Sequence, residues 1–109
     1  MDEIMIDALI VEPNQYPYDI TLVKDKDLIE FHITDFFDGE CNTEIMKIAD
    51  NVCIIYNSLA KKFNRKVCNK LIYGNFYIVG LDKSNCLVSL TDNIKQLYTH
   101  WFACGLLLS

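Results

Sequence analysis

Two pairs of short apolar runs, each pair separated by a short turn, constrain the fold of this chain most strongly. Residues 44–48 (EIMKI) and 52–56 (VCIIY) flank one turn, and residues 75–81 (NFYIVGL) and 86–90 (CLVSL) flank another. Short apolar runs on either side of a turn of a few residues are typical of β-hairpins. The sequence therefore predicts two hairpins in its second half.

The first half of the chain predicts two strands and a helix. Residues 5–11 (MIDALIV) form a mostly apolar run that ends before Pro13, and residues 18–23 (YDITLV) alternate apolar and polar side chains. Both patterns indicate strands. Residues 24–37 fit two patterns, because some of their apolar residues share a helical face and others alternate as in a strand. We favour a helix near residues 25–37, ended by Gly39.

The C-terminal segment predicts a second helix. Thr91 is placed to cap it, Asp92 suits the first turn, and Gly105 is in a common terminating position. Its apolar residues are spaced so that they share one face of a helix: Ile94, Leu97, Tyr98, Trp101 and Phe102. The polar, basic residues 57–69 between the two hairpins are expected to form a loop with a short helical turn.

Together these elements predict one α+β domain spanning residues 1–109. An antiparallel or mixed sheet of about five to six strands would carry the C-terminal helix on one face. The 109 residues are 51% hydrophobic, which is enough for one core. The acidic N-terminus and the short apolar runs predict no signal peptide and no membrane contact, and hence a cytoplasmic protein.

Cysteine and histidine usage gives no sign of a metal, cofactor or catalytic site. The five cysteines are at least twelve residues apart, so no zinc knuckle is present, and reduced thiols are expected. Cys41, in a polar turn, is the first candidate for a reactive thiol. His32 and His100 lack a partner motif and are interpreted as structural. Acid pairs such as Asp25/Asp27 lack the dense oxygen pattern of a calcium loop. We therefore predict a protein without enzymatic activity.

Charge is divided unevenly along the chain. Residues 1–50 carry thirteen Asp/Glu and three Lys, a formal charge of −10, whereas residues 51–109 carry two Asp/Glu and seven Lys/Arg, a formal charge of +5. Spaced carboxylates can imitate the phosphates that a nucleic-acid-binding protein recognises, although a solvated acidic surface gives the same pattern. The candidate partner-binding carboxylates are Asp25, Asp27, Glu30, Asp35, Asp38 and Glu40.

A basic cluster supplies the alternative binding site. Phe63 and Tyr73 lie in or near this cluster, where they could stack on bases while the cations neutralise phosphates. An ordinary solvated surface is the other interpretation, and Asn64-Arg65 suits a structural turn in which Arg binds a carboxylate. The candidate basic residues are Lys61, Lys62, Arg65 and Lys66, with Lys70 close by.

Several short motifs occur together: Val-Glu-Pro at residues 11–13, Asn64-Arg65, GNFYIVG at residues 74–80, and Ser-Leu-Thr at residues 89–91. With them the chain resembles, over roughly residues 5–103, a small domain-of-unknown-function family of bacterial phages, plasmids and conjugative elements. Residues 57–60 (NSLA) keep only the first residue of the family's Asn-Glu-Glu-Gly turn, and the expected glycine pair near Gly39 is a single glycine. The resemblance implies an accessory protein of a mobile element.

Phages and plasmids often encode small acidic proteins that block host defence nucleases. By that analogy, the leading hypothesis is a protein that inhibits a restriction or CRISPR nuclease, or its ribonucleoprotein complex, through the acidic surface. The alternative is a nucleic-acid-binding accessory factor that uses residues 61–70. Self-association between the acidic and basic segments is a further expectation. Charge reversal at Asp25, Asp27, Asp35 and Asp38 should weaken binding if the acidic surface is the site.

Overall fold

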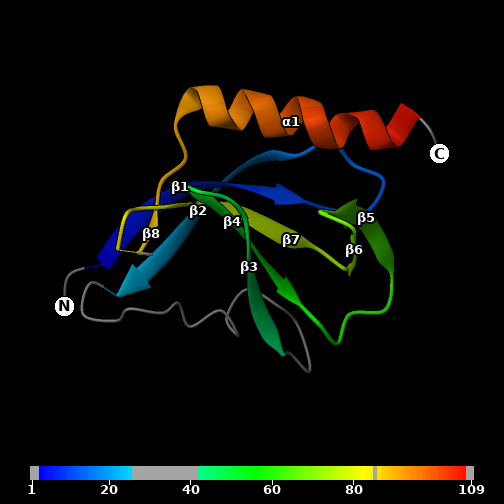
Figure 1. The fold of residues 1–109 in the computed structure, drawn as a ribbon, viewed down its shortest axis with the longest axis horizontal. Coiled ribbons are helices and arrows are strands. Elements are labelled where there is room, and N and C mark those ends of the chain that lie inside the picture. Colours follow the sequence, from blue (N-terminus) through cyan, green and yellow to red (C-terminus); the bar gives the residue numbers. More distant parts are fainter. Residues whose placement is uncertain (1–2, 26–41, 85, 108–109) are drawn as a thin grey trace.

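A six-stranded antiparallel sheet with a helix packed on one face forms the framework of the protein (Figure 1). The computed structural model describes residues 3–25, 42–84 and 86–107. The elements are β1 (Glu3–Val11), β2 (Tyr18–Asp25), β3 (Thr43–Ala49), β4 (Val52–Asn57), β5 (Phe63–Val67), β6 (Lys70–Tyr73), β7 (Phe76–Leu81), β8 (Leu87–Val88) and α1 (Asp92–Leu107).

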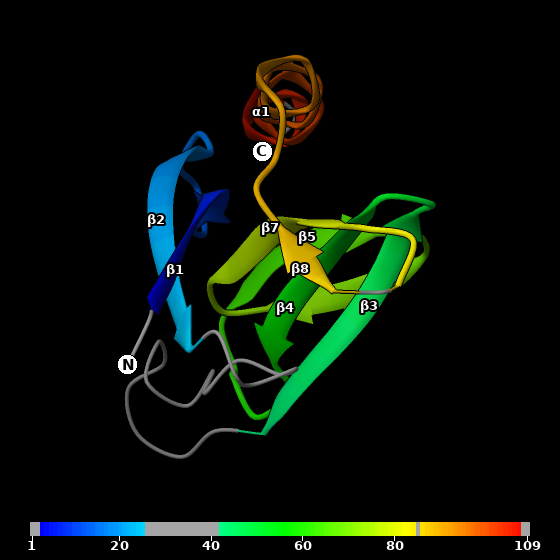
Figure 2. The same cartoon turned by 90° about the vertical axis from the view of Figure 1, so that its left-hand side faces the viewer.

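The strands of the main sheet run in the order β2-β1-β7-β4-β3, and β8 adds to β7. Their pairings are all antiparallel. β5 and β6 form a separate two-stranded antiparallel ribbon. In Figure 2 the sheet curves strongly, and α1 is seen end-on beyond one of its faces. The predicted α+β fold and both hairpins are confirmed.

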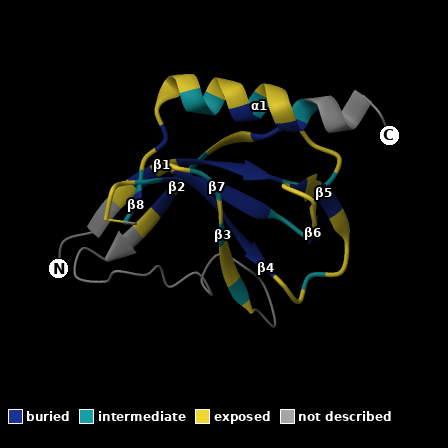
Figure 3. Cartoon of the chain, viewed as in Figure 1, coloured by how far each residue is buried: buried dark blue, intermediate teal, exposed yellow. Residues whose placement is uncertain are grey.

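The central strands are buried on both faces, because their apolar runs do not alternate with polar residues. All six residues of β4 are buried, and five of the six in β7 (Figure 3). On the helix side, Ile54, Phe76 and Ile78 pack in one cluster with Tyr98 and Phe102 of α1. On the opposite face of the sheet, Cys53, Ile55, Tyr77 and Val79 belong to a second hydrophobic cluster.

α1 begins at the predicted cap but presents a narrower apolar face than predicted. The Thr91 hydroxyl accepts a hydrogen bond from the Ile94 amide at 3.4 Å. Tyr98 and Phe102 are buried, whereas Leu97 and Trp101 remain 57% and 51% exposed. The helix also continues through Gly105 to Leu107, so the predicted end at Gly105 is wrong. A glycine inside a helix costs only about 1 kcal/mol and does not itself end one.

No helix within the described ranges is both long and apolar enough to cross a membrane.

The predicted loop at residues 57–69 is wrong in its second part, because β5 occupies residues 63–67 and pairs with β6. Cys68 and Asn69 connect the two strands with φ angles of 49° and 67°. Two positive φ angles match the twist of a two-residue hairpin turn, which usually carries Asn-Gly. With Cys-Asn at this place, the usual sequence signal is absent.

The predicted helix near residues 25–37 lies outside the described residues, except for Asp25. Asp25 is the last residue of β2, so the strand extends two residues beyond the predicted end at residue 23.

Gly74 and Gly80 are fixed by close packing. Gly74 has a φ of 75°, and a Cβ there would lie 2.5 Å from the Cβ of Ala60. Gly80 lies inside β7, where a Cβ would approach the carbonyl oxygens of Val88 and Ser89 to 2.9 and 3.0 Å. Only glycine avoids these contacts. Both glycines of the GNFYIVG motif therefore have structural roles.

Candidate functional site

The β5–β6 ribbon has an inward and an outward face, and a β-bulge in β5 interrupts the alternation of side chains between them. Phe63 pairs with Tyr73, but the next pair is Arg65 with Ile72, so the register shifts by one residue at Asn64. A bulge lets two consecutive side chains turn toward the same side. As a result Asn64 and Arg65 are both buried, with exposed fractions of 6% and 8%.

Asn64 attaches the ribbon to the main sheet. Its side-chain amide donates to the carbonyl oxygen of Val11, at the end of β1, at 2.8 Å. The same amide nitrogen donates to the carbonyl oxygen of Gly74 at 2.7 Å. Both acceptors are main-chain groups that would otherwise need another donor, so Asn64 has a structural role as the sequence suggested.

Arg65 attaches the ribbon to α1 and to the turn between β1 and β2. Its Nε donates to the Phe102 carbonyl at 3.2 Å, and its Nη2 donates to the Gln15 carbonyl at 2.7 Å. Its Nη1 donates to the main-chain and side-chain oxygens of Asn64. These acceptors are neutral oxygens rather than the carboxylate that the sequence suggested. Desolvation lowers the pKa of the guanidinium, which nevertheless stays charged at any physiological pH.

The buried position of Arg65 therefore does not support its predicted place on a binding surface. Its guanidinium is directed into the protein, where it makes contacts between three elements. Substituting it would report on folding rather than on partner contact.

The outward face combines apolar and basic side chains. The rings of Phe63 and Tyr73 meet edge to face, with centroids 5.7 Å apart. Phe63, Leu71 and Tyr73 are 50%, 52% and 37% exposed, and Lys66, opposite Leu71, is exposed as well. We call these four residues, Phe63, Lys66, Leu71 and Tyr73, the hairpin face.

Three more lysines flank the hairpin face. Lys61 and Lys62 are exposed in the segment before β5, and Lys70 is exposed at the start of β6. The Lys70 ammonium lies 5.8 Å from the centre of the Tyr56 ring, within the range of a cation–π contact. Of the predicted basic residues, Lys61, Lys62 and Lys66 are therefore exposed, and Arg65 is buried. Lys70 is exposed as well, but it pairs with Val67 on the other face of the ribbon, where its ammonium contacts Tyr56.

Most of the predicted acidic site lies outside the described residues. Asp25 lies at the end of β2, and the other five candidates, Asp27, Glu30, Asp35, Asp38 and Glu40, lie outside the described residues.

Other motif residues contribute to the framework. Ser89 Oγ accepts a hydrogen bond from the Asp7 amide at 2.9 Å, and the Leu90 amide donates to the Asp7 carbonyl at 2.9 Å. Glu12 accepts a hydrogen bond from the Tyr18 hydroxyl at 2.7 Å, which raises the pKa of Tyr18. These contacts join β1 to β2 and to the segment before α1. These motif residues therefore contribute to the fold.

Asn57 organises the turn at residues 57–60. Its side-chain oxygen accepts hydrogen bonds from the amides of Asn42 and Leu59, at 2.9 and 3.0 Å. Asn57, the one residue that this turn shares with the Asn-Glu-Glu-Gly pattern, therefore stabilises the turn itself.

The thiols and histidines differ in accessibility. Cys53 is buried, and desolvation raises its pKa to about 11, which makes it a poor nucleophile. Cys68 is exposed at the ribbon tip, and His100 is exposed on α1. Cys41 and His32 lie outside the described residues. Within the described residues, no group of three or more His, Cys, Asp or Glu side chains could hold a metal ion.

The hairpin face is the surface of the described chain that most clearly combines exposed rings with exposed cations. It stands on a ribbon whose inward side is fixed by Asn64 and Arg65. No protein-family model, curated protein or solved structure matches the chain. The hairpin face is therefore interpreted from its own chemistry.

Proposed function

We propose that the chain is a nucleic-acid-binding accessory factor that binds single-stranded nucleic acid on the hairpin face. The observation that carries this proposal is the exposed Phe63–Tyr73 ring pair on a ribbon that also carries exposed lysines. Lys66 shares the hairpin face with the rings, and Lys61, Lys62 and Lys70 are close to its residues in sequence. Cations attract the phosphate backbone, and aromatic rings stack on bases regardless of their identity. A single strand can present both groups at once.

Stacking favours a single strand over a duplex. Bases inside a duplex are stacked on one another, and their faces are closed to protein side chains. An unpaired base can lie on an exposed ring, and such a contact contributes about 1–3 kcal/mol. Phe63 and Tyr73 provide this surface at the end of the ribbon where β5 begins and β6 ends.

The anchored ribbon supports recognition because it is ordered before the ligand arrives. Asn64 and Arg65 bind main-chain groups of β1, α1 and the β1–β2 turn. A side chain on a fixed ribbon loses less conformational entropy on binding than one on a free loop.

The test is binding of a labelled oligothymidine of about 12 nucleotides, measured by fluorescence anisotropy. Phe63→Ala and Tyr73→Ala should each weaken binding about tenfold, as expected for the loss of one stacking contact. Lys47→Ala, an exposed lysine on β3, is the matched control and should leave the affinity unchanged.

Salt dependence tests the lysines separately. If all four of Lys61, Lys62, Lys66 and Lys70 contact phosphates, the logarithm of the affinity should fall with the logarithm of salt concentration with a slope of roughly −3. Replacing all four by Ala should make this slope nearly flat. Wild-type protein that fails to bind the oligonucleotide at low salt would remove the proposal.

A second candidate function rests on the charge of the N-terminal half. Residues 1–50 carry a formal charge of −10, and the whole chain carries −5, which opposes general attraction to nucleic acid. We therefore also propose, as the competing function, inhibition of a host defence nuclease by the acidic surface. Reversal of Asp25, Asp27, Asp35 and Asp38 should then abolish capture of the nuclease from the natural host. Capture that survives this reversal in a folded protein would exclude the acidic surface as the site.

A further inference from the structure

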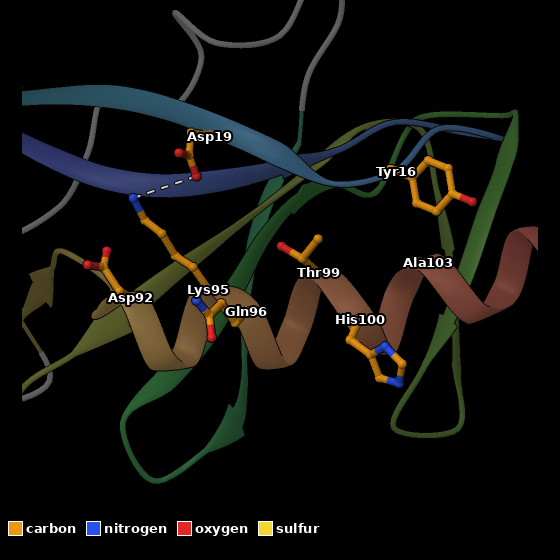
Figure 4. Close-up of a pocket in the computed structure, with 8 residues that line it drawn as sticks. All are labelled: Tyr16, Asp19, Asp92, Lys95, Gln96, Thr99, His100 and Ala103. Carbon is orange, nitrogen blue, oxygen red and sulfur yellow. Dashed lines mark ion pairs between the residues drawn. The ribbon is translucent and has the colours of Figure 1, made fainter.

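A groove of about 600 Å³ lies between β2 and α1 and shares no lining residue with the hairpin face (Figure 4). Tyr16 and Asp19 line it from the end of the β1–β2 turn and the start of β2. Lys95, Thr99 and His100 are among the residues that line it from α1. The volume is in the range of ligand sites, but the groove is open, and charged side chains are among those that line it. An enclosed apolar ligand is therefore a poor fit.

β2 forms the end of the main sheet beside this groove. Within the described residues, its eight residues pair with β1 on one side, and no strand pairs with its other side. A sheet edge of this kind presents unpaired main-chain N–H and C=O groups to any extended segment that approaches it. Addition of a strand there would extend the sheet along the opening of the groove.

The carboxylate of Asp19 is only partly neutralised. Lys95 Nζ lies 3.6 Å from Asp19 Oδ1, which is beyond a good hydrogen bond, and the Asp19 side chain is 76% exposed. Asp92, one turn before Lys95, is exposed and lines the same groove. The two carboxylates and one ammonium leave a net negative charge at this end of the groove, so a basic group is the complementary one.

We propose that the β2 edge and the groove bind an extended, basic segment of a partner protein by strand addition. The segment's main chain pairs with β2. A residue opposite Asp19 faces the same side of the sheet as Asp19, and so do the residues two positions away. Arg or Lys at these alternate positions reaches Asp19 and Asp92, and the exposed ring of Tyr16 offers a further cation contact.

Other occupants match this edge less well. Residues 26–41 of the same chain carry five acidic residues and one lysine, so they share the charge sign of Asp19 and Asp92. A second copy of the chain would bring two β2 strands together, with Asp19 and Asp25 in each. These alternatives are decided by the experiment.

The probe is a blocked peptide, Thr-Arg-Val-Arg-Thr, titrated into the full-length protein and followed by amide chemical shifts and calorimetry. The expected result is shifts in β2 and in the first half of α1. The matched peptide Thr-Glu-Val-Glu-Thr should bind at least about tenfold more weakly, because its charges are reversed. Two N-methylated Arg peptides, modified at odd or at even residues, test strand addition. Only one of the two should lose affinity, because alternate N–H groups point to the same edge.

Asp19→Asn should weaken binding of the Arg peptide about tenfold, whereas Asp50→Asn, at the exposed β3–β4 turn, should leave it unchanged. Phe63→Ala should also leave it unchanged, which separates this site from the hairpin face. Equal affinity for the two charge-reversed peptides, equal loss with both N-methylated peptides, or shifts confined to the hairpin face would overturn the proposal. Concentration-dependent dimerisation that Asp19→Lys disrupts would also overturn it, because the edge would then bind a second copy.

Discussion

The two faces of the β5–β6 ribbon are made by residues that are neighbours in sequence, yet they have opposite roles. On the inward face, Asn64 and Arg65 are buried and bind carbonyl groups of β1, α1 and the β1–β2 turn. On the outward face, Phe63 and Lys66 are exposed, with no such anchoring contacts among the described residues. The bulge at Asn64 is what places two consecutive residues on the inward face.

A basic cluster in sequence is not yet a basic surface. Lys62, Arg65 and Lys66 look equivalent along the chain, but the bulge at Asn64 turns the guanidinium inward and leaves the lysines in solvent. A planar guanidinium with several donors suits a site rich in carbonyl groups, whereas an ammonium on a flexible stem suits solvent. The choice of Arg or Lys at each position is consistent with this division.

The largest effect is expected from Arg65→Ala. The substitution removes a buried group that donates to four oxygens, so the free energy of unfolding should fall by about 3 kcal/mol. Lys66→Ala, the neighbouring residue on the other face, should change it by less than about 0.5 kcal/mol. Chemical denaturation followed by circular dichroism measures both. Equal losses would show that the two faces do not differ as described.

Gly74→Ala should come next, with a loss of about 2 kcal/mol in the free energy of unfolding. The added methyl group would both clash with Ala60 and occupy a φ of 75°, which disfavours a side chain. The double substitution Ala60→Gly with Gly74→Ala removes the clash and should retain a loss of about 1 kcal/mol from the backbone conformation alone. If the double variant were no more stable than Gly74→Ala, close packing at Ala60 would not be the cause.

The smallest effect is expected at the ribbon tip and has the opposite sign. Cys68 has a φ of 49°, so Cys68→Gly should raise the free energy of unfolding by about 0.5 kcal/mol. Cys68→Ala removes the thiol without relieving the backbone and serves as the control. Thermal denaturation under reducing conditions compares the two variants. A gain in both would point to the thiol rather than to the backbone as the source of strain.

Much of the fold could be predicted from the sequence because its strands carry strong local patterns. The apolar runs in β4 and β7 and the turns beside them indicated both hairpins, and Thr91 marked the start of α1. The β5–β6 ribbon was missed because β5 is short and polar, β6 is only four residues long, and the turn carries Cys68-Asn69 in place of Asn-Gly. The bulge lies at one polar residue followed by two basic ones, a pattern too weak to predict a bulge from one sequence.

The sequence indicated which basic and aromatic residues gather near the candidate site, but not which way each side chain points. Lys61, Lys62 and Lys66 are accessible as proposed, and the nearby rings of Phe63 and Tyr73 do meet, at 5.7 Å. Arg65 was assigned to the same set because the charge of a residue does not show whether its side chain points into the protein or into solvent. The groove beside β2 had no signal at all, since Asp19 and Lys95 are 76 residues apart and meet only in the folded chain.

Local sequence patterns specify the strand and helix segments of the core, because burial on one or both faces requires apolar residues at a regular spacing. The sequence also determined how charge was divided between the two halves. Packing between distant segments sets which cations face solvent, which carboxylate meets Lys95 and which strands end the sheet. These properties depend on register and on packing between distant segments, and a one-residue shift such as the bulge at Asn64 reverses the direction of a side chain.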